Sequence, residues 1–541
     1  MDFSLGIAIG YFEKDDIFNG RKYLEVFFEE NNAKNKNIPQ KDYENYKTIL
    51  KKIFFEKLYT YINNKDYEKS TLILDCITAF VDEKEYNTSN FWATAGICFK
   101  EFNSLDCAID CMKKATGFKT FNPDVFRQIG DIYYFDKDDK LNAISYYEKY
   151  IGYIKENPYV YNVLGHLYEN VYKSEFWERQ IRYFEKAHKI MPKNKEFLDN
   201  LILVTGKNKQ LEKFKKYTKE LLANNPTEND CYDYGCRCFN NKIFDEAHKY
   251  LFRRFFKENG ATEYPNVTEK LWDGKEDLSQ KTLLVRYEQG FGDTIMFCRF
   301  VPKLKNLAKD IIFKVQPQLF SLIKPNFPDI TVVPDTKEYE NIEYDRQIPL
   351  MELISVFKIT DQNMIGKDKY LSVSEEKIKD FREKYIKDKK FNIGIAFNGK
   401  ENYTGDNRDI PADLISKLAD NKNVRLFSLQ VNNNKDLTTC ERYSKITDLA
   451  KVLDSFETTA AAIENMDLIV STDNVILNLS AALGQKTFGI FNYYPDYRWF
   501  TLNGNDSGWY NSIKVYQNKK YDDWENTFEK IYSDVEKIVN Q

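Results

Sequence analysis

The chain has 541 residues, a length that suggests two to four domains, each able to bury a core. Its formal net charge of −4 gives no electrostatic argument for nucleic-acid binding. No apolar run reaches the length of a membrane span. The three histidines all lie in the first half, at His166, His188 and His248. This excludes any mechanism in the second half that needs a histidine base, Ser-His-Asp hydrolysis included.

The first residues contain a short apolar stretch, but Asp2 stands where a signal peptide needs positive charge. We therefore expect a buried element there and a cytoplasmic protein. The nine cysteines fit that location because they are scattered. The pairs Cys107/Cys111 and Cys236/Cys238 do not have zinc-ligand spacing, and no histidine lies close by to complete a site. The sequence predicts no metal site and favours cysteines as small core side chains.

Prolines recur in the first half at a nearly constant interval. Pro123, Pro158, Pro192 and Pro226 follow one another at steps of 35, 34 and 34 residues. Such a period is typical of stacked pairs of helices, in which proline ends the second helix of each pair. Small residues keep the same step, for example Gly96 and Gly235 followed 12 residues later by alanine. The pattern predicts close helix–helix contacts at these positions.

This region resembles the tetratricopeptide repeat (TPR) over about residues 88–257. The resemblance departs from the repeat at Leu201, which replaces the expected glycine, and near Phe176, where a few residues are added. Residues 1–87 form a predicted helical region of degenerate repeats or a cap, interrupted by a polar loop around 31–40, and 88–260 form the predicted repeat domain. Two interpretations stay open. The repeats recognise a protein or peptide acceptor in their groove, or they only support folding and a homodimer.

The second half alternates short apolar runs with amphipathic stretches, which indicates parallel α/β sheets. Two α/β lobes, 261–388 and 389–541, are predicted, joined near Lys389 at the end of a lysine-rich helix at 375–390. Eight runs are the expected strands: TLLVRYE, IIFKVQ, ITVVPD, YDRQIPL, NIGIAFNG, RLFSLQV, DLIVSTD and TFGIFNYY. Ligands of such sheets bind at the carboxyl ends of the strands.

The first strand end with site chemistry carries the sequence Glu-Gln-Gly-Phe-Gly-Asp, residues 288–293. It lies between an apolar run and a helical pattern, so we expect a strand, a glycine turn and a helix. Asp293 is expected where that helix begins. Its carboxylate is either an N-cap or a base that faces a ligand cleft.

Two further strand ends carry polar residues. In the loop 398–411, Arg408 is a candidate phosphate clamp, because guanidinium pairs with two oxygens at once; the alternative is a surface salt bridge. After the run DLIVSTD, Thr472 or Asp473 is expected to cap a helix from about Asn474 to Leu483. The amides of that helix would face a diphosphate.

Together these segments resemble a known family. EQGFGDTIMFCRFVPKL, KVQPQL, NIGIAFNG, NRDIP, LFSLQ, DSFETTAAAIENMDLIVSTD, SAALGQKTFGIF, PDYRW and DSGWY occur in the order seen in TPR glycosyltransferases. The catalytic region of that family is similar to heptosyltransferases, with bacterial flagellin and other protein O-glycosyltransferases as more distant relatives. The resemblance covers about residues 265–530 and the repeats upstream. It implies an α + α/β chain in which a helical solenoid precedes a GT-B pair of Rossmann-like lobes.

The resemblance also implies roles for individual residues. The Gly-x-Gly-Asp turn of the family falls on Gly290, Gly292 and Asp293, which makes Asp293 the implied general base and Gln289 part of the acceptor-side loop. The arginine before Ile-Pro falls on Arg408, an implied diphosphate contact. Donor binding further involves the remaining strand-end residues, namely Asn398, Thr472, Asp473, Asn474 and Asn478.

The chain departs from the family at Asn478, where members usually carry a histidine. Asparagine offers only a neutral amide to a phosphate. The usual DSPWYP segment also differs, reading Asp506-Ser-Gly-Trp-Tyr-Asn511. Stabilisation of the leaving group would then depend on Arg408 and a helix dipole.

The primary hypothesis is transfer of a sugar from a nucleotide-sugar co-substrate to a hydroxyl of a protein acceptor, without a further cofactor. The resemblance implies inversion and no metal. The first alternative is a non-catalytic binding or scaffold protein with a decayed transferase region. A nicotinamide dehydrogenase is the third hypothesis, which the missing third glycine (Ile295) disfavours. The sequence leaves the sugar, the nucleotide and the acceptor open.

Overall fold

The computed structural model describes residues 3–30, 39–256, 268–399, 408–431 and 435–540. The polar loop predicted at 31–40 lies mostly outside these residues, as does most of the loop 398–411. The chain divides into two compact units, Met1–Tyr172 with Phe176–Phe197, and Lys173–Glu175 with Leu198–Gln541.

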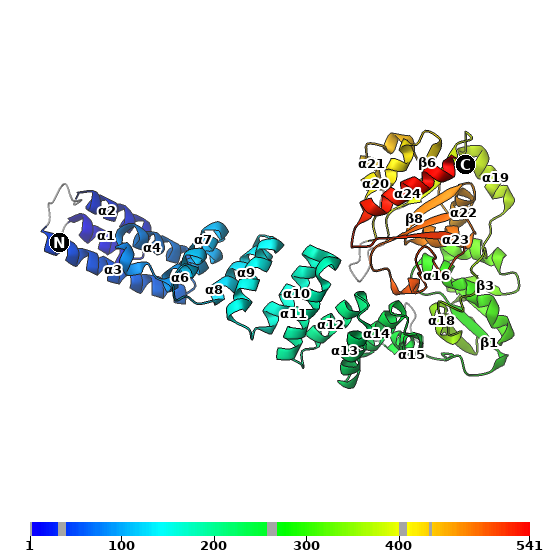
Figure 1. The fold of residues 1–541 in the computed structure, drawn as a ribbon, viewed down its shortest axis with the longest axis horizontal. Helices are drawn as coiled ribbons and strands as arrows, with labels where there is room; N and C mark the ends of the chain where they lie inside the picture. Colours follow the sequence, from blue (N-terminus) through cyan, green and yellow to red (C-terminus); the bar gives the residue numbers. More distant parts are fainter. Residues whose placement is uncertain (1–2, 31–38, 257–267, 400–407, 432–434, 541) are drawn as a thin grey trace. The chain divides into compact units, whose positions relative to one another are not determined.

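Unit 1 consists of helices that pack in chain order as neighbouring pairs (Figure 1). Its helices are α1 (Phe3–Glu13), α2 (Ile17–Glu30), α3 (Gln40–Asn63), α4 (Tyr67–Phe80), α5 (Glu83–Tyr86), α6 (Ser89–Glu101), α7 (Leu105–Thr116), α8 (Asp124–Asp131), α9 (Lys140–Tyr153), α10 (Pro158–Tyr172) and α11 (Trp177–Ile190). The pairs α6/α7, α8/α9 and α10/α11 repeat one helix-turn-helix arrangement, as in TPR proteins. The apolar N-terminal stretch is the buried element that we expected, since Leu5, Ala8 and Phe12 of α1 are fully buried.

Glycines set the distance between the two helices of each pair. A Cβ atom on Gly96 would lie 2.5 Å from Met112, and one on Gly165 would lie 2.4 Å from the ring of Phe184. Gly130 stands at the equivalent position against Tyr147. The recurring small residues therefore mark close helix–helix approaches, as the period predicted.

The close approach at Gly165 predicts a large effect from one methyl group. Gly165→Ala is expected to lower the free energy of unfolding by about 1–3 kcal/mol, because the Phe184 ring must move in a packed core. Gly152→Ala in α9 is the matched control, since nothing lies within 4 Å of its Cβ position. That variant should gain up to about 1 kcal/mol from helix propensity. Urea unfolding of both variants tests this, and equal effects would contradict it.

Unit 2 begins with helices and continues into two parallel sheets. The helices are α12 (Lys195–Lys207), which starts in unit 1, α13 (Leu211–Ala223), α14 (Glu228–Asn240) and α15 (Phe244–Leu251). Helices α14 and α15 form the last helix pair of the series. Gly235 lies at their contact, where an added Cβ would meet the Leu251 backbone at 2.9 Å. The period thus continues into unit 2.

The first sheet has four parallel strands in the order β3-β2-β1-β4. The strands are β1 (Leu278–Arg286), β2 (Ala308–Val315), β3 (Thr331–Pro334) and β4 (Arg346–Pro349). Its helices are α16 (Phe291–Phe297), α17 (Pro317–Ile323) and α18 (Leu353–Val356). The apolar run of β1 fills the middle of the sheet, where Leu283, Leu284 and Val285 are fully buried. All four strands were predicted, from the runs TLLVRYE, IIFKVQ, ITVVPD and YDRQIPL.

The second sheet has six parallel strands in the order β10-β9-β8-β5-β6-β7. The strands are β5 (Phe391–Ala396), β6 (Val424–Ser428), β7 (Ile446–Asp448), β8 (Leu468–Thr472), β9 (Thr487–Phe491) and β10 (Ile513–Gln517). Its helices are α19 (Glu375–Tyr385), α20 (Ala412–Ser416), α21 (Lys435–Thr439), α22 (Phe456–Glu464), α23 (Val475–Ala482) and α24 (Trp524–Val539). The sequence missed the two edge strands, β7 with three residues and β10 with five, both of which end in a polar residue.

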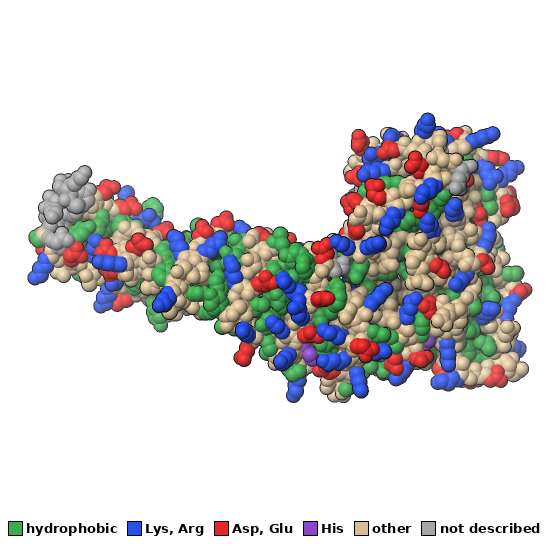
Figure 2. Space-filling view, viewed as in Figure 1, with side chains coloured by type: hydrophobic (Ala, Val, Ile, Leu, Met, Phe, Trp, Pro, Cys, Tyr) green, Lys and Arg blue, Asp and Glu red, His purple; other side chains and the backbone are tan. Residues whose placement is uncertain are grey.

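Basic and acidic side chains alternate over the face that Figure 2 shows, in line with the small net charge. Within the described ranges, no helix is long and apolar enough to cross a membrane. The nine cysteines are free thiols. Six of them are buried, as the sequence predicted, but Cys107 is exposed because it lies on the outer face of α7.

Candidate functional site

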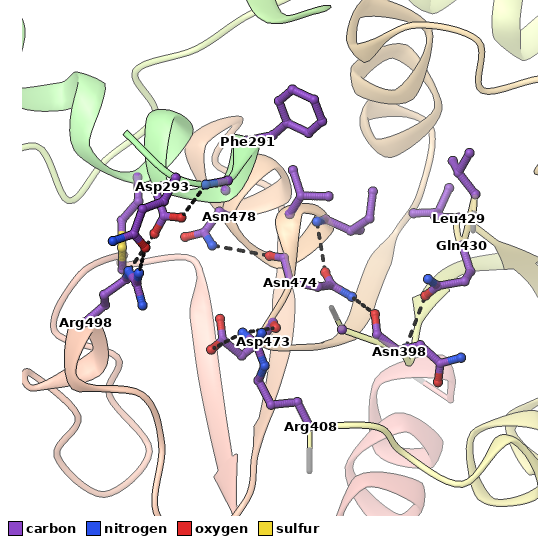
Figure 3. A pocket seen from close by; sticks show the side chains of 18 of the residues that line it. Phe291, Asp293, Asn398, Arg408, Leu429, Gln430, Asp473, Asn474, Asn478 and Arg498 are labelled. Atoms are coloured by element: carbon purple, nitrogen blue, oxygen red, sulfur yellow. Dashed lines mark hydrogen bonds and ion pairs between the residues drawn. The ribbon is translucent and has the colours of Figure 1, made fainter. Parts of the chain in front are cut away.

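The carboxyl ends of both sheets contribute to one pocket of about 1120 Å³ in unit 2 (Figure 3). Its residues come from the turn after β1, from the segments after β5, β6 and β8, and from the segment after β9. The pocket includes every site residue that the sequence predicted except Thr472, which borders a smaller neighbouring cavity. Strand ends far apart in the chain thus form one lining, as expected of parallel sheets.

Asp293 is the third residue of α16, where its side chain binds the N-cap residue, and it also lines the pocket. One carboxylate oxygen accepts a hydrogen bond from the backbone N–H of Gly290 at 3.0 Å, at the start of α16. The other oxygen lies 2.6 Å from the guanidinium Nε of Arg498. Burial raises the pKa of Asp293, while the Arg498 charge opposes that increase. The N-cap of α16 is Gly290, so the N-cap alternative for Asp293 is wrong by three positions, although the carboxylate still accepts from the cap amide. The role of Asp293 as a base stays a prediction.

Arg498 is the site residue that sequence reasoning missed. It belongs to the short turn Tyr497–Trp499 after β9, and its guanidinium contacts Asp293, Asp496 and Gln289. Its pKa is raised because the charges of Asp293 and Asp496 outweigh the effect of burial. The signal was available, since Arg498 follows the end of a predicted strand in the same sheet as Arg408.

Arg408 faces the pocket but is engaged with a neighbouring carboxylate. Its guanidinium Nη1 lies 3.1 Å from the Asp473 carboxylate and donates to the Asp473 backbone carbonyl, also at 3.1 Å. The pKa of Asp473 is raised by burial, against the opposing charge of Arg408. Thr472 donates its hydroxyl to the Arg408 carbonyl at 2.5 Å, so it fixes the backbone of this arginine. The alternative of a surface salt bridge is only partly correct, because the pair is mostly buried.

The cap of α23 differs from the prediction. Neither Thr472 nor Asp473 caps this helix; the Asn474 side chain accepts from the amides of Ile476 and Leu477 at 2.9 and 3.1 Å. Asparagine is a strong N-cap, and it stands one position closer to the helix. These two amides are already hydrogen-bonded, which leaves fewer of them for a diphosphate than the sequence suggested.

Asn478 has a structural role in the wall of the pocket. Its amide oxygen accepts from the Tyr510 hydroxyl at 2.9 Å, and its amide nitrogen donates to the Asn474 carbonyl at 3.3 Å. A Cβ atom on Gly292 would lie 3.3 Å from that nitrogen, so glycine permits the close contact of the two segments. The departure from the family pattern is thus compatible with a packed, hydrogen-bonded site.

The far side of the pocket is lined by Asn398 and the segment 429–431. The side-chain oxygen of Gln430 accepts from the backbone amide of Asn398 at 3.2 Å (Figure 3). It also accepts from the backbone amide of Phe397 at 3.3 Å. The Asn398 carbonyl accepts from Asn474 at 3.2 Å. These bonds connect the ends of β5, β6 and β8. Among the described residues, no group of three His, Cys, Asp or Glu side chains has an arrangement that could hold a metal ion.

A buried ion triad anchors the turn that carries Asp293. Arg254, which follows α15, contacts Glu288 at 3.0 Å and Glu352 at 2.5 Å. Glu288 also accepts from the amide of Met351 at 3.1 Å. All three charged side chains are at most 7 % exposed, and burial raises the pKa of Glu352 against the opposing Arg254 charge. The last helix pair is therefore joined to residue 288, the first residue of the turn.

The triad predicts that replacing either of two adjacent arginines has very different effects on the free energy of unfolding. Arg254→Met should lower the free energy of unfolding by about 3–5 kcal/mol, because two buried carboxylates lose their cation. Arg253→Met is the matched control. Arg253 pairs with Glu228 where both side chains are at least 30 % exposed, so its loss should cost at most about 1 kcal/mol. Chemical denaturation of unit 2 in the full chain measures both values, and similar losses would contradict the anchoring role.

Comparison with known proteins identified helical-repeat structures among the similar solved structures. No protein-family model and no curated protein matches the sequence. The similar solved structures include the C-terminal part of a TPR repeat-containing protein from Cytophaga hutchinsonii, at 17% identity over 47% of this chain and 95% of that chain, with a TM-score of 0.31. MamA is 17% identical over 30% of this chain and 92% of its own, with a TM-score of 0.26. YrrB, described as a TPR protein with an unusual peptide-binding site, is 13% identical over 32% of this chain and 85% of its own, with a TM-score of 0.27. The assignment of TPR-like repeats rests on the helix pairs described above.

Proposed function

We propose that the protein is a glycosyltransferase of the GT-B type, which transfers a sugar from a nucleotide-sugar donor to a hydroxyl of a protein or peptide. One observation carries the proposal: a single pocket at the carboxyl ends of two parallel sheets contains a carboxylate, Asp293, and two arginines, Arg408 and Arg498. Its volume of about 1120 Å³ is sufficient for a nucleotide-sugar together with an acceptor side chain.

The chemistry divides between the two sides of the pocket. Asp293, on the side of the first sheet, accepts the proton of the acceptor hydroxyl while the acceptor oxygen forms a bond to the anomeric carbon. The bond between that carbon and the diphosphate oxygen breaks, and its electron pair leaves with the diphosphate. The positive charge of Arg408, on the side of the second sheet, stabilises the departing group. The TPR-like helix pairs supply a surface for an extended acceptor.

A rival function is a binding protein with a decayed transferase region. The engagement of Asn478 with Tyr510 and Asn474 favours it, because the position usually held by a histidine serves packing here. The two functions separate in a thermal-shift screen against UDP-, GDP-, CMP- and ADP-linked sugars. A donor that binds the folded state raises the unfolding temperature by mass action. A shift with at least one donor, followed by its turnover, supports the enzyme, and the absence of both overturns it.

Asp293→Asn tests the base. Loss of the carboxylate should reduce transfer by at least about 100-fold, the usual contribution of a general base. The variant loses the ion pair with Arg498, but the loss of stability should be limited, because the asparagine oxygen can still accept from Gly290 and Arg498 keeps its contact with Asp496. Asp310→Asn on β2, whose side chain is 61% exposed, is the matched control. The measurement is single-turnover transfer alongside thermal unfolding, and near-normal transfer by Asp293→Asn would end the assignment.

The pKa of Asp293 predicts the pH dependence of kcat/KM. The base must be ionised, and burial raises its pKa above the ordinary value of 3.8. The rate should therefore fall as the pH drops through that raised pKa, and the acidic limb should lie above pH 3.8. A pH–rate profile in buffers of constant ionic strength measures the limb. A profile without an acidic limb in the range where the protein stays folded would contradict the role of Asp293.

A further inference from the structure

Arg498 occupies a position between the two sides of the pocket. Its guanidinium Nε lies 2.6 Å from Asp293 and its Nη1 donates to Asp496 at 2.6 Å, while Nη2 donates to the Gln289 side chain. Asp293 and Gln289 belong to the turn after β1, whereas Asp496 belongs to the segment of Arg498 itself. Arg498 therefore connects the proposed base on one sheet with the strand ends of the other.

The backbone of Arg498 is held firmly. Its amide donates to the Asp496 carboxylate at 3.0 Å, and its carbonyl accepts from the indole of Trp509 at 2.7 Å. The Trp509 side chain is completely buried. The preceding ring, Tyr497, lies 5.0 Å from the guanidinium and packs toward α14, where its hydroxyl is 3.5 Å from that of Tyr232. With a fixed backbone, Arg498 can change partners only by turning its side chain within the pocket.

The charges of the pocket favour such an exchange. The lining contains two arginines, Arg408 and Arg498, and three aspartates, Asp293, Asp409 and Asp473. A diphosphate brings more negative charge into this lining and needs cations within reach. Arg408 is held by both the side chain and the backbone carbonyl of Asp473. Arg498 keeps the carboxylate of Asp496 even when it leaves Asp293, so its own charge stays compensated.

We propose that Arg498 is a diphosphate-binding catalytic residue, which exchanges its contact with Asp293 for the diphosphate of the donor. The inference rests on the proposed function and adds a residue to it. The guanidinium offers five donors in a planar fork, which suits two phosphate oxygens. It supplies the cation that Asn478 cannot supply.

The exchange couples the two halves of the reaction. When Arg498 turns to the diphosphate, Asp293 loses the positive charge that opposes the effect of burial on its pKa. The charged groups around Asp293 are then Asp496 and Asp473, both of which favour its protonation. The base becomes stronger when the leaving group is bound. The proton moves from the acceptor hydroxyl to Asp293, the acceptor oxygen bonds to the anomeric carbon, and the electron pair of the broken bond goes to the diphosphate oxygen beside Arg498.

The test measures binding of inorganic pyrophosphate to the full chain by isothermal titration calorimetry. Four proteins form a double-mutant cycle: wild type, Arg498→Gln, Asp293→Asn and the double variant. Arg425→Gln is the matched control. Arg425 lies on β6, pairs with Asp388 at 3.2 Å and is not part of the pocket lining. Thermal unfolding of each variant verifies that it is folded.

Arg498→Gln is expected to weaken pyrophosphate binding by about tenfold or more, as expected for a lost charged hydrogen bond. Asp293→Asn should tighten it several-fold, since Asp293 competes for Arg498, and this gain should vanish in the double variant. Arg425→Gln should bind as wild type does. Unchanged affinity in Arg498→Gln, or an equal gain from Asp293→Asn in both backgrounds, would overturn the role of Arg498 alone. Wild-type protein that binds neither pyrophosphate nor any nucleoside diphosphate would overturn the proposed function as well.

A second readout applies if Arg498→Gln does not fold. Arg498→Lys keeps one charge but loses the planar fork, so it should bind pyrophosphate more weakly than wild type while Asp293→Asn alone still binds more tightly. In the folded variants, the acidic limb of kcat/KM should move to higher pH when Arg498 is replaced, because Asp293 loses its cation. A limb that does not move would show that Arg498 has no influence on the base and would contradict the exchange.

Discussion

The six residues from Glu288 to Asp293 are held at both ends by buried charge, and the pocket depends on this constraint. At the first end, Arg254 balances Glu288 and Glu352 in surroundings that exclude water. At the second end, Asp293 meets Arg498. The turn between them contains two glycines, one of which allows the wall formed by Asn478 to approach. A turn with so little side-chain volume needs such anchors, because glycine itself fixes no conformation.

Hydrogen bonds among strand ends give the opposite side of the pocket its shape. Gln430 joins the ends of β5 and β6, and Asn474 joins β8 to Asn398 while it caps α23. Each polar side chain thus satisfies backbone groups that a strand or helix leaves unpaired at its end. The same side chains present their remaining surface to the pocket. Under the proposed function, the same residues therefore have to satisfy the backbone and to contact the ligand.

Much of this arrangement could be predicted from the sequence, because periodicity and strand ends are local signals. The interval of the prolines and glycines predicted the helix pairs, and eight apolar runs predicted eight of the ten strands that the described residues form. Partners could not be predicted in the same way. Whether Arg408 meets Asp473, or Asp293 meets Arg498, depends on side-chain directions at distances of 65 and 205 residues along the chain. The predicted N-cap of α23 was wrong by one or two positions. Thr472, Asp473 and Asn474 are all residue types that cap helices well, and the sequence does not show that the chain turns into the helix at Asn474.

The triad of Arg254 also decides where the chain can be divided. The last helix pair looks like one more repeat, and by its pattern alone it would be grouped with the solenoid. Its final arginine nevertheless completes the charge balance of the α/β part, and the compact unit that contains both sheets includes the chain from Leu198 onward. An exchange of repeat arrays between related chains, by recombination or by design, would therefore have to keep α14 and α15 with the sheets. The repeat pattern thus continues into helices that belong structurally to the α/β part.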